Sequence, residues 1–317
     1  MARIPIGVAA NSPDARQVVA AVRDLERRGI NAAWLTTGGA GLDGLTLLAA
    51  AAARTERVRL GTSITPTWPR HPIVATQQAQ VIAQLAPGRF RVGVGPSHRP
   101  AVEGIFGFKY EAPVRNLREY VTVARRLLRD GNVDFSGKVY KAAASIARPL
   151  PDVPVMASAL REASYEVCGE LADGAISWVS PHAYLRDKAL PALRAGAARA
   201  GRPAPPLVAH VPVCVHGDVN EVRAAVREQL ATYPRSFNYQ EMFAASGHPE
   251  AREGTWSNAM IDAVVVSGGE EQVAMRLREL SEWGFGELLV TVVPAGADAV
   301  GSRERALSLL AEVAKAR

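Results

Sequence analysis

Short apolar runs alternate with helix-like segments along almost the whole chain of 317 residues, and this alternation limits the possible folds most strongly. Strands that alternate with helices are typical of parallel sheets, and eight such units favour a closed (β/α)8 TIM barrel over an open doubly wound sheet. We therefore expect an α/β protein with one barrel domain over residues 1–317. The runs predicted as strands are 4–9, 32–36, 58–64, 90–94, 153–157, 175–179, 207–215 and 287–293.

Local signals mark the ends of several predicted helices. Ser12, Pro13 and Asp14 are expected to open the first helix, with the Ser12 hydroxyl as the cap and the proline at the first helical position. Gly29 is expected to end this helix, because glycine readily adopts the left-handed conformation found there. A short hairpin is predicted over residues 134–141.

The helix after strand three is predicted to begin at His71 and Pro72. We interpret His71 as a structural residue of this helix start rather than as a catalytic one. The larger apolar residues of the helix recur at helical spacing and are expected to share one face: Val74, Val81, Ile82 and Leu85.

The alternation breaks over residues 233–257, which are aromatic and polar and contain Gly247, Pro249 and Gly254. We therefore expect an enlarged, irregular insertion between strands seven and eight. Aromatic residues of irregular segments either shape a substrate pocket or hold long loops in place. The residues concerned are Trp68, Tyr239, Phe243 and Trp256.

Composition narrows the compartment and the partners. The chain opens on a strand-like run rather than a signal peptide, and its longest apolar-rich run, 45–53, is too short to span a membrane. Cys168 and Cys214 lie in apolar surroundings without ligand spacing, which favours the reducing cytoplasm. The net charge is +6, but the arginines are scattered beside acidic residues, so we expect solvated helix faces rather than nucleic-acid binding. Four histidines lack metal-ligand spacing and are interpreted as non-catalytic: His182, His210, His216 and His248.

Small and hydroxyl residues follow two predicted strands at their carboxyl ends, where ligands bind in α/β proteins. Strand three runs into Gly61-Thr62-Ser63, and strand four into Gly95-Pro96-Ser97-His98. Small residues let a ligand approach the backbone, and the His98 imidazole titrates near neutrality. The loop Ser158-Ala159-Leu160-Arg161 precedes a helix whose free N–H groups suit a phosphate, unless Ser158 is a plain helix cap. Trp178 ends strand six, either as a wall of the cleft or as a core residue.

Four segments, in this order along the chain, resemble the luciferase-like monooxygenase superfamily: LGTSITPTWPRHP, GRFRVGVGPSHRPAVEGIFG, ALREASYEVCGELADGAISW and SGGEEQVAMRLRELSEWGFGELLVTVVP. The GPSH loop and the ELADGAISW segment are most similar to actinobacterial oxidoreductases that use the deazaflavin coenzyme F420. The resemblance implies a cytoplasmic enzyme, commonly a homodimer, that passes a hydride between F420 and a small organic substrate. An FMN-dependent monooxygenase that receives reduced flavin from a separate reductase is the first alternative.

The resemblance also assigns roles to the strand ends. It implies that Gly61, Thr62 and Ser63 back the coenzyme ring and that a cis peptide, Ser63-Ile64 or Thr62-Ser63, lies behind it. The loop of Gly95, Pro96, Ser97 and His98 would contact the coenzyme's chain or ring edge. The resemblance further implies that the phosphate binds in the loop of Ser158, Ala159, Leu160 and Arg161.

One departure from the resemblance concerns the chemistry. Many F420-dependent relatives carry an acid, or an acid and a histidine, at the end of strand two, whereas this chain has 34–39, WLTTGG. A proton needed for reduction would then come from His98, from Glu103 or from water, and His98 is the leading catalytic residue by elimination. The departure leaves two further alternatives open, a non-catalytic flavin-binding protein and an unrelated barrel enzyme that binds phosphate after strands seven and eight.

Overall fold

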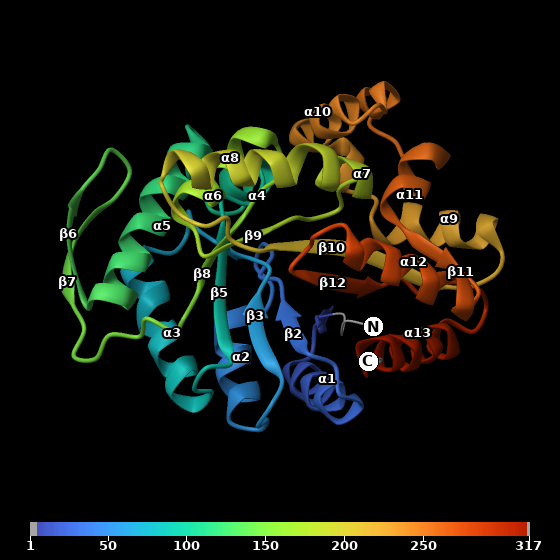
Figure 1. Cartoon of the computed structure of the whole chain (residues 1–317), viewed down its shortest axis with the longest axis horizontal. Helices are drawn as coiled ribbons and strands as arrows, with labels where there is room; N and C mark the ends of the chain where they lie inside the picture. The colour runs from blue at the N-terminus through green and yellow to red at the C-terminus, as the bar shows by residue number, and fades with distance from the viewer. Residues whose placement is uncertain (1–4, 316–317) are drawn as a thin grey trace.

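A closed barrel of parallel strands forms the centre of the computed structural model, which describes residues 5–315 (Figure 1). Strand β10 pairs with both β12 and β9, and these two pairings close the ring. All eight predicted strands are confirmed. Within the described residues the barrel strands are β1 (Ile6–Ala9), β2 (Ala32–Leu35), β3 (Arg59–Thr62), β5 (Phe90–Gly95), β8 (Val155–Ser158), β9 (Gly174–Ile176), β10 (Leu207–Val215) and β12 (Glu287–Val292).

Helices surround the barrel, and the segments between strands and helices carry smaller elements (Figure 1). The predicted hairpin is confirmed as β6 (Asn132–Ser136) and β7 (Lys141–Ser145). A two-residue strand, β4 (Thr65–Pro66), pairs with β5. The surrounding helices include α1 (Ala15–Arg28), α2 (Gly44–Ala52), α3 (Pro72–Leu85), α5 (Pro113–Asp130), α6 (Glu162–Leu171), α8 (Leu190–Arg199), α12 (Glu270–Glu282) and α13 (Ala299–Lys315).

The first helix starts two residues later than predicted. Asp14, not Ser12, is the cap, and its carboxylate accepts a hydrogen bond from the Gln17 N–H at 2.9 Å. The Ser12 hydroxyl instead accepts from the Asp14 N–H. The carboxylate is the better cap because an ionised acceptor binds a helix N–H more strongly than a hydroxyl does.

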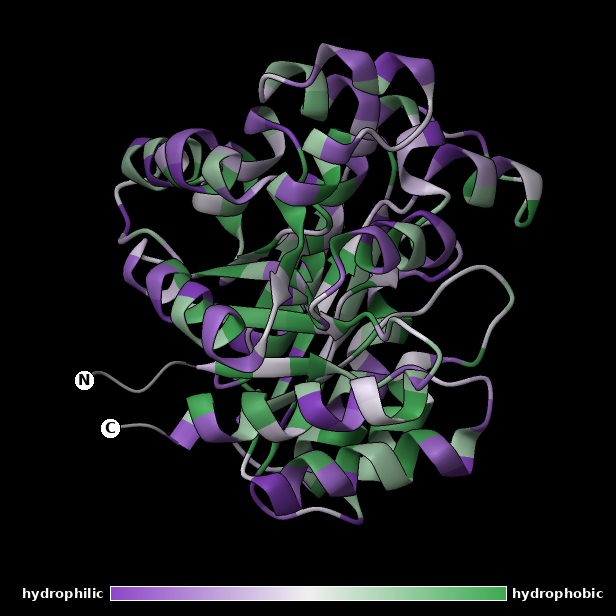
Figure 2. Cartoon of the chain, turned by 90° about the vertical axis from the view of Figure 1, so that its right-hand side faces the viewer, coloured by the Kyte–Doolittle hydropathy of each residue, from purple (hydrophilic) through white to green (hydrophobic). Residues whose placement is uncertain are grey.

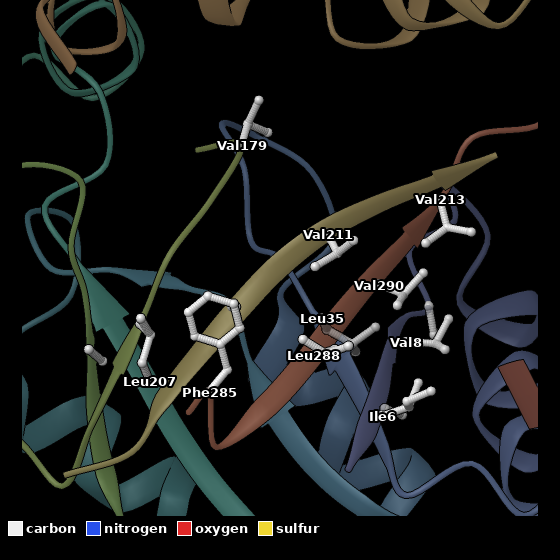
Figure 3. Close-up of a cluster of buried hydrophobic side chains, with 14 of the residues drawn as sticks. Ile6, Val8, Leu35, Val179, Leu207, Val211, Val213, Phe285, Leu288 and Val290 are labelled. Atoms are coloured by element: carbon white, nitrogen blue, oxygen red, sulfur yellow. The ribbon is translucent and has the colours of Figure 1, made fainter. Parts of the chain in front are cut away.

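The barrel strands separate two cores because successive side chains point to opposite faces. Outward-facing side chains of β1, β10 and β12, such as Val8, Val211 and Val290, lie side by side along these strands (Figure 3) and belong to the larger buried cluster. Colouring by hydropathy shows apolar strands in the interior and many polar residues on the outer helices (Figure 2). The inward-facing residues form a smaller cluster: Ala32, Trp34, Met156, Ile176, Val208 and Leu289.

Trp34 fills the centre of the barrel, and glycines make room for it. A Cβ at Gly7 or Gly61 would overlap the indole. The indole N–H donates to Glu287 at 2.7 Å, and the Arg91 guanidinium lies over the ring and also pairs with Glu287. This cluster fills the amino-terminal half of the barrel interior with paired charges. A ligand can therefore bind only at the opposite end, where the strands have their carboxyl termini.

The insertion between β10 and β12 is confirmed, but most of it is helical rather than irregular. Helix α10 forms within the stretch because Tyr239, Met242 and Phe243 recur at helical spacing and are buried together, in spite of the glycines and proline that follow. The insertion contains α9 (Val219–Gln229), a 3₁₀ turn η2 (Tyr233–Arg235), α10 (Phe237–Ala245), a 3₁₀ turn η3 (Pro249–Glu253), α11 (Asn258–Val264) and the short strand β11 (Val266–Gly268).

The apolar residues of α3 are divided between the core and the surface, which contradicts the prediction of one shared face. Val74, Val81 and Leu85 are exposed, whereas Ile82 is buried. The buried face consists mainly of small residues, among them Ala75 and Ala79, because α3 packs against both α2 and α5. No helix in the described part of the chain is long and apolar enough to cross a membrane.

Candidate active site

A cavity of about 670 Å³ lies at the carboxyl ends of the barrel strands, and its volume is typical of a small-molecule site. It receives residues from the ends of β2, β3, β5, β8 and β9 and from helix α10 of the insertion. Ten of the thirteen residues proposed for coenzyme binding contribute to its lining, and other residues complete it. The lining residues among those proposed are Ser63, Ile64, Pro96, Ser97, His98, Ser158, Ala159, Leu160, Arg161 and Trp178.

Gly95 brings three distant segments of the sequence together. A Cβ at this position would overlap the Ser158 hydroxyl and lie 3.1 Å from Cγ1 of Ile64. The ends of strands β3, β5 and β8 therefore meet around a residue without a side chain. This close approach forms a cradle of backbone and small groups, which suits a flat ring.

The end of β3 carries the cis bond between Ser63 and Ile64 that the resemblance implied. Residues at the end of β2 hold this bend: the Thr36 hydroxyl donates to the Ser63 carbonyl at 3.0 Å, and the Thr37 N–H donates to the Ile64 carbonyl. Both threonines also line the cavity. At the place where an acid was expected, this chain thus has two hydrogen-bonding residues that support the bend.

Gly61 and Thr62 lie below the cavity rather than in its lining. Gly61 faces Trp34 in the barrel interior. The Thr62 hydroxyl is fully buried, donates to the Gly93 carbonyl at 2.7 Å and accepts from the Gly93 N–H. Gly61 and Thr62 therefore make contacts inside the barrel and between strands. They support a ligand site only indirectly.

His98 lines the cavity from the loop after β5, just before the short helix α4 (Arg99–Gly104). Its side chain does not cap that helix, and its ring lies 5.7 Å from the ring of Tyr239. His98 is exposed at the open cavity, but desolvation by the surrounding walls lowers its pKa below the usual value of 6.5, so the imidazole is mainly neutral at pH 7. The preceding residue, Ser97, has a φ of 59° and accepts a hydrogen bond from the Tyr110 hydroxyl through its carbonyl.

Glu103, the other side chain considered as a proton donor, is outside the lining. Its carboxylate pairs with Arg99 at 2.6 Å and accepts from the Tyr110 N–H at 3.1 Å. It therefore holds the loop in place. Of the two side chains considered, His98 is the one that reaches the cavity.

The loop after β8 leads into the amino end of α6. The helix begins at Glu162, with Arg161 as a cap residue that makes no side-chain cap hydrogen bond, so Ser158 is not a helix cap. The Ala159 N–H donates to the Ile176 carbonyl and is unavailable to a ligand. Arg161 and the first turn of α6 border the cavity, and this placement combines a guanidinium with helix N–H groups.

An aromatic wall faces these loops, and we use this name for Trp178, Tyr233 and Tyr239. The indole N–H of Trp178 donates to the Tyr233 hydroxyl at 2.6 Å. The rings of Tyr233 and Tyr239 are 5.0 Å apart and nearly perpendicular. Trp178 therefore lies in the wall of the cleft. Its partly buried indole also packs against the inward-facing cluster of the barrel. Sequence reasoning did not assign Tyr110, Tyr233 or Met242 to the cavity, because no motif marks them.

The remaining aromatic residues and histidines of the sequence analysis have other surroundings. Phe243 and Trp256 contact each other in the core, and Trp68 lies beside Tyr110 outside the lining. His71 is structural, as predicted, because its Nδ1 accepts from the Ile73 N–H at the start of α3. His182 and His210 are buried, and desolvation lowers the pKa of each to about 3.

Comparison with known proteins places these features in a family context. The family model described as luciferase-like monooxygenase matches residues 1–287. An uncharacterized protein of Mycobacterium tuberculosis is 31% identical over 320 residues, which cover 91% of this chain and 93% of that protein. An F420-dependent glucose-6-phosphate dehydrogenase of Microbacterium testaceum is 37% identical over 177 residues, which cover 53% of this chain and 52% of that enzyme.

Two solved structures have the same fold at low sequence identity. An F420-dependent secondary alcohol dehydrogenase in complex with an F420–acetone adduct has a TM-score of 0.80 and 19% identity, over 97% of this chain and 99% of that one. A type II Baeyer–Villiger monooxygenase of Pseudomonas putida, in complex with FMN, has a TM-score of 0.73 and 16% identity, over 98% and 97% of the chains. The similarity of these two structures concerns the fold.

Proposed function

The chain belongs to the luciferase-like monooxygenase family, and we propose that it is an oxidoreductase that binds coenzyme F420 in the cavity described above. The observation that carries this proposal is the cradle at Gly95, where Ile64 and Ser158 approach the same glycine. The names of relatives that use F420 support the choice of coenzyme. The second reactant is a small organic molecule that gains or loses a hydride.

Two parts of the cavity suit two parts of such a coenzyme. The bend at Ser63 and Ile64 and the loop around Pro96 would lie against the flat ring. Arg161 and the N–H groups that open α6 would hold the phosphate, because a helix amino terminus and a guanidinium both favour an anion. Glu162 also borders this part, so a metal-free phosphate would sit nearer to Arg161 than to that carboxylate.

His98 is the proposed proton-transfer residue. When bound, the deazaflavin accepts or supplies the hydride. The neutral imidazole of His98 takes the hydroxyl proton of an alcohol as the hydride leaves its carbon, and in reverse it returns that proton to the carbonyl oxygen. Desolvation favours the neutral form, which is the form required for oxidation of the alcohol.

A titration of the purified protein with F420 and with FMN tests the coenzyme. We expect F420 to bind in the micromolar range and Arg161→Ala to weaken binding roughly tenfold, the loss of one charge-assisted contact. Arg305→Ala, on helix α13, is the matched control, because it removes another exposed arginine that does not line the cavity. Micromolar binding of FMN without binding of F420 would instead favour an FMN-dependent monooxygenase. This alternative is considered because an FMN-bound monooxygenase has the same fold. Turnover of any substrate with either reduced coenzyme would exclude a non-catalytic binding protein.

We also propose that the protein is a homodimer that joins through α2 and α3. These neighbouring helices contain no charged residue, and Val81 on their outer surface is 52% exposed. A twofold interface brings the same surface of two copies together, and an uncharged face meets its own copy without like-charge repulsion. Val81→Glu is expected to give a monomer in light scattering, whereas Met275→Glu, at a position on α12 that is 64% exposed, should leave the dimer intact. The buried thiols Cys168 and Cys214 suit the reducing cytoplasm, which we propose as the compartment.

A further inference from the structure

We infer that the substrate is an uncharged, ring-containing organic molecule that binds in the cavity against His98 and the aromatic wall of Trp178, Tyr233 and Tyr239. The inference rests on the proposed function for the placement of the coenzyme. It goes further in assigning the chemical class of the second reactant.

The shape of this part of the cavity favours a ring. Tyr239 is the central residue, because its ring lies 5.7 Å from that of His98 and 5.0 Å from that of Tyr233. Trp178 continues the wall through its hydrogen bond to Tyr233. Because these rings are already in contact with one another, a ligand ring would not enter between them but would pack against the side of the wall that faces the cavity, stacked or edge to face. Met242, one turn along α10 from Tyr239, adds a polarizable apolar side chain to the same lining.

The electrostatic environment disfavours charge of either sign. Burial raises the pKa of Tyr110 to about 12 and that of Tyr239 well above its usual value, and both shifts oppose an anion. Desolvation lowers the pKa of His98, which opposes a cation. A carboxylate or phosphate that entered here would lose its hydration, and such a group is costly to bury without a partner.

The charged lining residues come from a single segment of the chain. Among the described residues of the lining, Arg161 and Glu162 are the ones that carry a full charge, and both belong to the junction of β8 and α6. The proposed coenzyme phosphate uses that junction. A phosphorylated sugar, the substrate named for the dehydrogenase of Microbacterium testaceum, would then meet the aromatic wall with its charge unpaired.

A pair of matched probes tests this inference. Benzaldehyde and 4-carboxybenzaldehyde share a ring and a carbonyl group and differ by one carboxylate, and glucose 6-phosphate represents the charged sugars. Each is titrated by calorimetry into the protein, with and without saturating oxidised F420. We expect benzaldehyde to bind at least tenfold more tightly than the carboxylate, and glucose 6-phosphate to bind more weakly than either. Equal or reversed affinities, or no binding of benzaldehyde, would overturn the inference.

Two neighbouring positions of α10 locate the effect. Asn238 lines the cavity, whereas Phe237 is 68% exposed and lies outside the lining. Asn238→Lys is expected to reduce the preference for benzaldehyde severalfold, because the carboxylate gains a partner, and Phe237→Lys should leave the preference unchanged. An equal change in both variants, or no change in Asn238→Lys with its thermal stability intact, would show that the probes bind elsewhere and would overturn the assignment.

The two proposals fail separately in these experiments. Absence of F420 binding in the coenzyme titration contradicts the proposed function, but the comparison of Asn238→Lys with Phe237→Lys in the coenzyme-free protein still tests the aromatic wall, because both variants retain Arg161. Conversely, tight F420 binding with a preference for the carboxylate contradicts the substrate class alone.

Discussion

The indole of Trp178 stacks on the imidazole of His210, with ring centroids 3.7 Å apart and planes inclined by 19°. Both imidazole nitrogens are engaged: Nδ1 accepts from the Val179 N–H at 3.0 Å, and Nε2 lies 2.9 Å from the Thr291 hydroxyl. Because Nδ1 accepts, the proton of the neutral ring is on Nε2, which donates to Thr291. His210 therefore supports one wall of the cavity from inside the barrel, although it does not line the cavity.

His210→Phe is expected to lower the free energy of unfolding by about 1–3 kcal/mol and to weaken ligand binding at the cavity. The phenyl ring retains a stacking surface, but the buried Val179 N–H loses its acceptor. Urea denaturation and benzaldehyde titration measure the two effects. His71→Phe is the matched control, because it removes an acceptor of a backbone N–H at the start of α3, away from the cavity. An equal loss of ligand affinity in both variants would contradict a specific role for His210.

Two alanine substitutions on β5 should have different effects. A Cβ at Gly93 would overlap the backbone carbonyl of Thr62, so Gly93→Ala is expected to cost about 1–3 kcal/mol of stability by overpacking. At Gly95 the Cβ would meet the Ser158 hydroxyl, which rotates more easily than backbone moves. Gly95→Ala should therefore reduce coenzyme affinity more than stability. Gly104→Ala, with open space around the new Cβ, is the control, and thermal melting with F420 titration separates these outcomes.

His98→Gln is expected to lower kcat by roughly 10²–10⁴ while coenzyme affinity changes little, because the substitution removes proton transfer but leaves the ring cradle. In the wild type, the rate of alcohol oxidation should rise with pH through the pKa of His98 and level off. Desolvation lowers this pKa below 6.5, so the rate is already near its plateau at pH 7. The variant should lose this inflection in its pH–rate profile. A wild-type inflection well above pH 7 would contradict the assignment.

Acid should destabilise the protein through its buried histidines. His182 and His210 have pKa values of about 3 in the folded state, against 6.5 for the unfolded chain. Between these values the unfolded chain binds protons that the folded protein does not, so the free energy of unfolding falls as the pH falls. Each histidine contributes a slope of about 1.4 kcal/mol per pH unit. Urea denaturation between pH 7.5 and 5.5 measures the slope, and it should be shallower in His210→Phe. Equal slopes in the two proteins would contradict the burial of a neutral His210.

Much of the candidate site could be located from the sequence because its loops follow strands, and strand ends are visible in the pattern of apolar runs. Ser63, Ser97 and Arg161 were found in this way. Thr62 was also proposed, but its hydroxyl is used by Gly93 on the neighbouring strand. Successive side chains of a strand point to opposite faces, so only one of two adjacent residues faces the ligand. A bend at the strand end changes which of the two it is.

The aromatic wall could be predicted only in part. Tyr239 and Trp178 stood out as aromatic residues in suitable places, but Tyr233 is separated from Trp178 by 55 residues and carries no motif. The spacing of Tyr239, Met242 and Phe243 was compatible with a helix, yet nearby glycines and a proline favoured an irregular segment. The segment is helical because its apolar residues are buried together against the end of the barrel. Such packing stabilises a short helix that helix propensity alone would not stabilise.

Local periodicity and the order of motifs are sufficient to predict the alternation of strands and helices, the insertion before the last strand and the family resemblance. The meeting of Gly95, Ile64 and Ser158 at one point, and the support of Trp178 by His210, cannot be predicted in this way. Such contacts arise when the barrel closes and brings the ends of non-adjacent strands to one edge. Their distances depend on register and side-chain direction across strands, which a linear pattern does not encode.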